Sequence, residues 1–239
     1  MDLEPVLETI PKIIATQTAK LTYNYLASRV KERIERNWEL MSKDMREKVD
    51  QGDPLRNDWF AENEVLNNRI SFRLLEKTIR EISNDSEERK SLHIAKFWVN
   101  ICLTSNADID QATAFSYFEA IESVSWRQLC IIRLIVLYGD HEVEIDPIDD
   151  EGQMPQDMQT SFYSISREYE KLMDDRYIDG ASVPTNTKNK NPFVRNPGSG
   201  WLPENTRRLY SLMNLHEIPD GDIEQTFSIW NVRMIQTSG

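Results

Sequence analysis

Cysteine is scarce in this sequence, with two residues in a chain of 239. A chain of that length buries roughly 70–75% of its extended surface on folding, so it needs no disulfide framework. Cys102 and Cys130 both stand within apolar helical patterns, where a thiol packs as a small hydrophobic group. We expect two buried thiols in a reducing compartment, and not a redox pair or a reactive thiol.

Long hydrophobic runs are also missing. The longest extends from Leu129 to Tyr138 and is interrupted by Arg133, whereas a membrane span needs about 20 apolar residues. The N-terminus carries acidic residues ahead of its first apolar stretch, whereas a secretory signal begins with basic residues. The sequence therefore predicts a cytoplasmic protein that does not enter a membrane.

Recognised catalytic motifs are absent as well. The sequence contains no glycine-rich phosphate loop, no G-x-S-x-G, no H-E-x-x-H and no C-x-x-C, which are patterns that carry common enzyme chemistry. Its three histidines, His93, His141 and His216, are far apart along the chain. His93 lies within an apolar helical pattern, where we expect a structural or surface role. We predict a protein that is not an enzyme, with no catalytic residue, no cofactor and no metal ion.

The net charge of −12 is unevenly distributed along the chain. Residues 121–180 include 14 acidic and five basic residues, whereas residues 181–239 include five acidic and six basic ones. An acidic segment of this kind repels DNA and phosphate-rich membrane surfaces. It favours a basic partner, or serves only solubility.

Eight acidic residues fall between Asp140 and Asp157, in a stretch that Pro147, Gly152 and Pro155 mark as a loop. Clustered carboxylates suggest a Ca²⁺ or Mg²⁺ site, and with it a small metal-dependent hydrolase or nuclease. Their order does not match the EF-hand, which needs a glycine at its sixth position and a glutamate at its twelfth. We expect a solvated acidic loop or a partner surface instead.

Apolar residues recur every three or four positions over most of the chain, which is typical of amphipathic helices. Ser125, followed three residues later by Gln128, has the spacing of a capping box, and Gly139 is the expected stop of the helix that follows. The first helix is either an arm that grips a partner or a second copy of the chain, or a surface helix lying on its own domain. The expected helices cover about residues 10–49, 62–82, 87–104, 110–121, 126–139, 158–174 and 203–215. Residues 141–146 predict a short strand, and residues 221–236 a last helix or strand.

Residues 122–215 resemble the winged-helix family in the order of their expected elements. These are a capped apolar helix, a connector, an amphipathic helix, a short strand, a polar loop, a second strand and a helix. In that family a helix similar to ISREYEKLMDDRYIDG packs behind a hairpin whose tip is the wing. The closing helix often begins with Leu-Thr-x-x-Gly-Arg-Arg-Leu; residues 202–209 match it, except that Pro203 and Thr206 replace the threonine and the glycine. The resemblance implies a hairpin between Tyr177 and Leu202.

The winged-helix resemblance would imply contacts with nucleic acid. A recognition helix needs hydrogen-bond donors on its exposed face, but residues 157–175 carry Arg167 and Lys171 among five acidic residues. The candidate contacts are Lys188, Lys190 and Arg195, which have no acidic residue near them between residues 181 and 200. Wing residues usually contact phosphates, which position the protein but do not select a sequence. The alternative, which we favour because of the acidic segment nearby, is a mobile solvated loop.

Residues 60–140 resemble helical bacterial proteins of the Abi-alpha type, which are grouped with abortive infection against phage. The resemblance lies in the stretch NDSEERKSLHIAKFWVNICLTS, a short helix, and then IESVSWRQLCIIRLI. In those proteins a polar start leads into a helix with an aromatic and aliphatic face, and a winged-helix-like end follows. The resemblance implies a role in phage defence or stress through protein contacts, and it transfers no catalytic residue.

The sequence thus predicts a mainly α protein, a helical bundle with a C-terminal winged-helix-like module that contains a short β-hairpin. We expect an N-terminal helical arm over residues 1–55, a helical core over 56–121 and the winged-helix-like module over 122–239. The expected function is that of a non-enzymatic bacterial interaction protein, related to phage defence or stress. It would act through contacts with another protein or with a second copy of itself. The alternative is a winged-helix transcriptional regulator that binds DNA.

Overall fold

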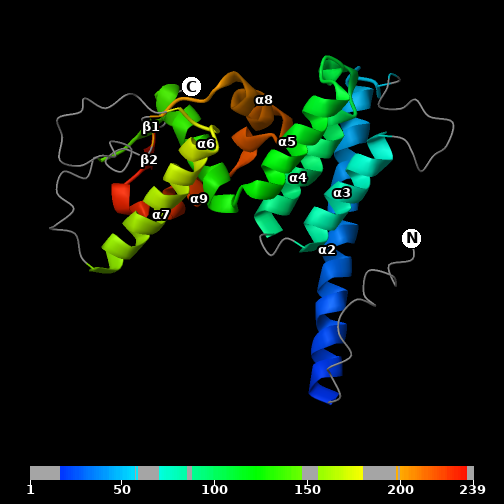
Figure 1. The fold of residues 1–239 in the computed structure, drawn as a ribbon, viewed down its shortest axis with the longest axis horizontal. Helices are drawn as coiled ribbons and strands as arrows, with labels where there is room; N and C mark the ends of the chain where they lie inside the picture. The colour runs from blue at the N-terminus through cyan, green and yellow to red at the C-terminus, as the bar shows by residue number, and fades with distance from the viewer. Residues whose placement is uncertain are drawn as a thin grey trace. The chain divides into compact units, whose positions relative to one another are not determined.

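The chain forms two compact units that divide between Gln111 and Ala112. The computed structural model describes residues 17–56, 58, 70–84, 88–146, 156–179, 198 and 200–235. Most of these residues are helical, which confirms the prediction of a mainly α protein (Figure 1). The domain limits expected after residues 55 and 121 stay a prediction.

Three helices pack together in the first unit, namely α2 (Gln17–Asp50), α3 (Ile70–Asn84) and α4 (Glu88–Ile101). α2 contacts both of the other helices, and its N-terminal part continues beyond them (Figure 1). All three contribute apolar side chains to the core, among them Met41, Leu74, Ile82, Ile94 and Phe97. Burial of these side chains is the main stabilising contribution to this unit.

Arg56 ties the segment after α2 to the end of α4. Its side chain is fully buried and forms an ion pair of 2.7 Å with the carboxylate of Asp58. The guanidinium also donates hydrogen bonds of 3.0 Å to the carbonyl oxygens of Asn106 and Ile109. These acceptors satisfy donors that would otherwise make a buried charge unfavourable.

The second unit is built around α6 (Trp126–Gly139). This helix contacts α7 (Gln156–Asp174), α9 (Asp220–Thr226), the short helix η5 (Leu215–Glu217) and strand β1. The predicted capping box is confirmed, because Ser125 Oγ accepts from the Gln128 amide at 3.2 Å and Gln128 Oε1 accepts from the Ser125 amide at 2.8 Å. The unit also contains α5 (Gln111–Ser123), α8 (Glu204–Leu212) and η6 (Ser228–Trp230).

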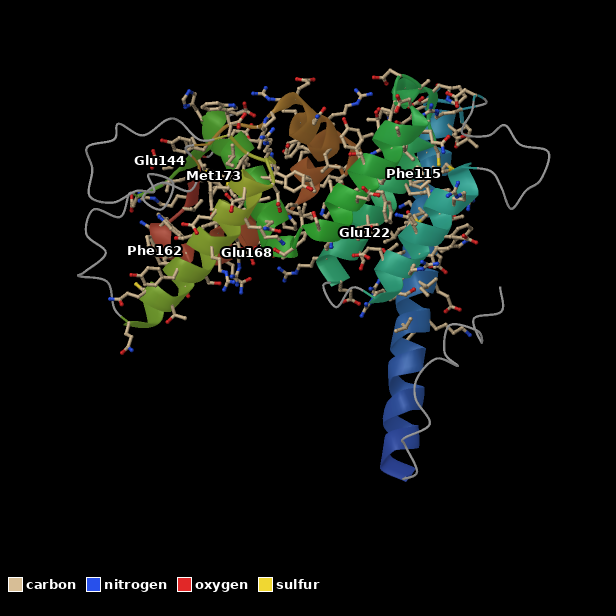
Figure 2. The ribbon with its side chains drawn as sticks, in the orientation of Figure 1. Phe115, Glu122, Glu144, Phe162, Glu168 and Met173 are labelled. Carbon is tan, nitrogen blue, oxygen red and sulfur yellow. The ribbon has the colours of Figure 1, made fainter. Side chains whose placement is uncertain are left out.

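Aromatic side chains connect α7 to the last part of the chain. Phe162, which Figure 2 labels on α7, stacks on Trp230 with ring centroids 5.6 Å apart. Phe227 contacts the same indole at 6.3 Å. All three rings are almost completely buried, so they form one aromatic cluster within the core of the second unit.

The two-stranded sheet in the described residues is antiparallel and pairs β1 (Val143–Glu144) with β2 (Arg233–Met234). The strand predicted over residues 141–146 is therefore confirmed, and the last segment contains both a helix and a strand. Between Tyr177 and Leu202, where the wing hairpin is expected, the described pairing is a single antiparallel bridge between Asp179 and Trp201. The rest of that expected hairpin, residues 180–197 and 199, lies outside the described residues.

The observed helices agree with the predicted ones to within a few residues where both are described. The third helix ends at Ile101 and not at residue 104, because Leu103 pairs with Leu55 and Thr104–Asn106 forms the separate short helix η2. The starts expected at residues 10 and 62 lie outside the described residues. Within the described ranges, no helix combines the length and the apolar character that crossing a membrane requires.

Left-handed residues that are not glycine follow the ends of α6 and α7. The expected stop of α6, Gly139, is still helical, and His141 takes the left-handed conformation with a φ of 59°. At the end of α7 the same position is taken by Arg176, with a φ of 61°. Glycine is the usual residue there, because a side chain in this conformation contacts its own backbone. α6 therefore ends at Gly139, as predicted, but the left-handed residue that follows it is His141 and not the glycine.

Candidate interaction surface

A cleft of about 340 Å³ lies in the second unit between the C-terminal end of α6 and α8. We call it the Trp201 cleft, because the indole of Trp201 lines it and is 48% exposed. Apolar and polar groups share its walls, chiefly Ile135, Asp140, Trp201, Leu202, Arg207 and Tyr210. Clefts that combine apolar area with a few oriented polar groups are typical of binding sites.

The backbone on either side of Trp201 is fixed by two contacts. The Trp201 amide donates to the carbonyl of Asp179 and the Asp179 amide donates to the carbonyl of Trp201, both at 2.9 Å. At Gly200, an added Cβ would lie 3.3 Å from both Tyr169 Oη and Ile135 Cδ1. The missing side chain therefore lets this segment pass close to α6 and α7, which places the indole at the surface.

Tyr210 connects the floor of the cleft to the interior. Its hydroxyl accepts a hydrogen bond of 2.7 Å from Nη1 of Arg133, the cation that interrupts the apolar sequence of α6. Burial raises the pKa of Tyr210, and the carboxylates of Asp140 and Glu142 act in the same direction, against the opposing effect of Arg133. The phenol is therefore held neutral beside acidic groups.

Arg207 supplies a cation at the rim of the cleft. Its Nε donates to the carbonyl oxygen of Leu202 at 2.9 Å, which fixes the direction of the side chain. Arg207 is exposed, and its guanidinium has no further hydrogen bond or ion pair within the described part of the chain. Its terminal N–H groups are therefore available to a carboxylate or a backbone carbonyl of another molecule.

A second cleft of the same unit, of about 550 Å³, is lined by α5, by the residues that directly follow α7 and by α8. Its lining includes the acidic residues Glu119 and Asp175, the cation Arg176 and the hydroxyl groups of Tyr177 and Ser123. The last two hydroxyls lie 3.2 Å apart and hydrogen bond to each other. The charges in this cleft are mixed, and its walls do not select one class of ligand.

The nucleic-acid-contact candidates Lys188, Lys190 and Arg195 lie outside the described residues. His93 is buried within α4, as expected for a structural histidine. Both cysteines are buried free thiols, as predicted. Burial raises the pKa of the Cys102 thiol well above its ordinary range, despite the nearby Arg56.

The acidic loop is described up to Asp146. This carboxylate accepts hydrogen bonds from Asn231 at 2.6 Å and from Arg233 at 3.1 Å, so it takes part in the junction between β1 and β2. Residues 147–155 lie outside the described part of the chain. In the described part, no group of three or more histidine, cysteine, aspartate or glutamate side chains is arranged to hold a metal ion.

The sequence did not predict the Trp201 cleft. One signal was present, namely a tryptophan directly after Gly-Ser-Gly in a polar stretch, where a large aromatic side chain has no obvious core to enter. Most of the other lining residues come from α6 and α8, which are about 70 positions apart along the chain. Periodicity predicts each helix but does not show which helix ends lie next to each other.

Comparison of the chain with protein-family models, with curated proteins and with solved structures finds no significant match.

Proposed function

We propose that this chain is a non-enzymatic interaction protein that acts through protein–protein contacts, in bacteria and in the context of phage defence or stress. The observation that carries the proposal is the composition of the Trp201 cleft. Trp201, Arg207 and Tyr210 line one cleft, and tryptophan, arginine and tyrosine are the residue types that supply most of the binding energy at protein interfaces.

The contacts of these three residues support the same conclusion. The indole of Trp201 is about half exposed on a fixed backbone, so little conformational freedom is lost when a partner covers it. Tyr210 is held by Arg133, and the guanidinium of Arg207 keeps donors for a partner's carbonyl or carboxylate group. Such a surface fits a protein segment that places an apolar side chain against the indole and an acceptor beside Arg207.

The test is affinity capture from bacterial cells with the tagged full chain and two matched variants. Trp201→Ala removes the indole of the cleft, and Tyr163→Ala removes an aromatic ring of the same unit that is 60% exposed on α7, away from the cleft. We expect a protein that the wild type and Tyr163→Ala retain, and that Trp201→Ala retains at least about tenfold less. Circular dichroism would confirm that both variants are folded.

Equal capture by all three proteins would show that the Trp201 cleft is not the interaction surface. A second result would also overturn the proposal. If the chain turned over a defined substrate and a single substitution abolished that turnover, it would be an enzyme and not an interaction protein.

A DNA-binding winged-helix regulator is the second candidate, and one observation favours it. The bridge between Asp179 and Trp201 follows α7 and precedes α8, which is where the base of a wing belongs in the resemblance described above. This candidate predicts DNA binding that weakens steeply as salt rises, and that loses affinity when Lys188, Lys190 and Arg195 are replaced by glutamine. Fluorescence anisotropy with duplex DNA at low salt tests it, and an unchanged signal at low salt would exclude it.

A further inference from the structure

One face of α2 carries an apolar stripe that its own unit leaves exposed. Asn37 and Met41 are buried against α3 and α4, whereas Trp38 is 45% exposed and Val49 is 38% exposed. Met45, between them, is partly exposed. At about 100° per residue, Trp38, Met45 and Val49 lie within roughly 40° of one another on the helix. We call these three residues the α2 stripe.

The spacing distinguishes this stripe from scattered surface hydrophobic residues. Leu40 is also exposed, at 41%, but it lies on the opposite side of α2 and has no apolar neighbour at helical spacing. Single residues of that kind are ordinary on protein surfaces, whereas a contiguous apolar group indicates an interaction site. Steps of seven and four residues are those of a helix-packing seam.

Several charged residues of α2 form ion pairs within the chain. Lys31 pairs with Glu35 at 3.8 Å, Lys43 pairs with Glu47 at 3.7 Å, and Arg36 pairs with Glu88 of α4.

Glu39 and Arg46 are both exposed, and neither has an ion-pair partner within the described part of the chain. The Nε group of Arg46 donates to the carbonyl of Ser42 in its own helix, at 3.3 Å. Seven residues apart, Glu39 and Arg46 lie on the same side of the stripe.

We propose that a second copy of this chain docks on the α2 stripe, with the two α2 helices antiparallel and a two-fold axis beside Ser42. In that arrangement Trp38 of each copy meets Met45 of the other, and Glu39 of each copy meets Arg46 of the other. The small side chain of Ser42 at the axis lets the two helices approach closely. A two-fold interface repeats every contact, so it contains two indole–thioether contacts and two ion pairs.

The positions of Glu39 and Arg46 decide the direction of the pair. A two-fold axis perpendicular to the helices brings the same side of both α2 helices together, so a glutamate and an arginine on one side become partners. In a parallel pair, the side of one α2 that carries Glu39 and Arg46 would face the other α2 on the side that carries Asn37 and Met41. That side is already buried by α3 and α4. The charges of Glu39 and Arg46 beside the stripe therefore match a second copy in the antiparallel direction.

This inference uses the first unit and does not depend on the Trp201 cleft, so the two proposals fail separately. Sedimentation velocity of the full chain over a wide concentration range measures the dimer. We expect Trp38→Ala to weaken dimerisation by at least about tenfold, and the matched variant Leu40→Ala to leave it unchanged. Helical circular dichroism would confirm that each variant is folded.

Charge reversal tests whether the two α2 helices are antiparallel. Glu39→Arg and Arg46→Glu should each weaken the dimer, because each places like charges opposite one another, and the double variant should restore it. A Ser42→Cys variant should form a disulfide between copies on mild oxidation, whereas Leu40→Cys should not. A chain that stays monomeric at all concentrations would overturn the proposal. A dimer that neither Trp38→Ala nor the single charge reversals weaken would also overturn it, because the copies would then associate through another surface.

Discussion

Nη1 of Arg133, in the middle of the buried helix α6, donates a hydrogen bond of 2.7 Å to the hydroxyl of Tyr210 on α8. The Nε atom of Arg133 is buried and has no hydrogen-bond partner among the residues that the structure describes. The phenol therefore provides an acceptor that the arginine needs. Tyr210→Phe should lower the free energy of unfolding by about 1–3 kcal/mol, because it leaves a second donor of Arg133 unsatisfied. Urea unfolding would measure this, with the exposed Tyr163→Phe as a control that should change stability little.

Arg56 should be the most sensitive position in the first unit. Arg56→Met keeps much of the side-chain volume, but it leaves the carboxylate of Asp58 and the carbonyls of Asn106 and Ile109 without their donor. We expect a loss of about 3 kcal/mol in the free energy of unfolding. Asp58→Asn should cost less, because the amide oxygen of asparagine can still accept from the guanidinium and Arg56 keeps its bonds to the carbonyls of Asn106 and Ile109. Equal losses from both variants would contradict this account.

Gly198 lies where no side chain fits. A Cβ at this position would be 2.6 Å from both Cβ and Cγ of Tyr138, so Gly198→Ala should destabilise the second unit by about 1–3 kcal/mol. Gly139 is the matched control, because it is helical and has open space around its missing Cβ. Gly139→Ala should be neutral or stabilising. Thermal unfolding of both variants tests the contrast.

Arg176 is held in a left-handed conformation that glycine adopts more easily. Its amide donates to the carbonyl of Met173 at 3.0 Å, and the next amide, of Tyr177, donates to the carbonyl of Leu172 at 2.8 Å. Arg176→Gly keeps both hydrogen bonds and should raise the free energy of unfolding by about 1 kcal/mol. The reverse change, Gly52→Ala after α2, should lower it by a similar amount, because Gly52 has a φ of 95°. A stability that falls in Arg176→Gly would mean that the arginine side chain contributes more than its conformation costs.

High pH should destabilise the second unit through Tyr169. Burial raises the pKa of this phenol far above its ordinary value of 10.0, although a hydrogen bond with the backbone of Gly200 opposes the shift. Above pH 10 the unfolded chain therefore loses a proton that the folded chain keeps, and stability falls as pH rises. The slope approaches about 1.4 kcal/mol per pH unit for one such tyrosine. Urea midpoints between pH 8 and pH 11 should decrease less in Tyr169→Phe than in the wild type.

Features determined by neighbouring residues were predictable from the sequence. The capping box of Ser125 and Gln128 depends on two side chains three positions apart, and it forms as expected. The periodicity of α7 likewise reports which face of that helix is buried, and the apolar sequence of α6 reports a helix that is buried on most sides. The left-handed ends at His141 and Arg176 were not predictable, because the expected residue there is glycine and the tertiary packing imposes the conformation.

Features that join distant segments could not be predicted. The cleft beside Trp201 needs the end of α6, the backbone near Gly200 and one face of α8 together. The α2 stripe was equally hidden, since the sequence left open whether the first helix grips a partner or lies on its own domain. Met41 and Trp38 are both apolar, and the structure shows that Met41 lies on the buried face of α2 whereas Trp38 lies on an exposed face.

The pairing of Val143 with Met234 has a consequence for the rate of folding. It closes a loop of roughly 90 residues, whose entropy must be lost before the strand contacts stabilise anything. The helices around α6 form from local contacts, so they can assemble before the sheet does. Amide protons of the sheet, such as that of Ile235, which is bonded to the Glu142 carbonyl at 2.8 Å, should therefore become protected from exchange later during refolding than those in the middle of α6.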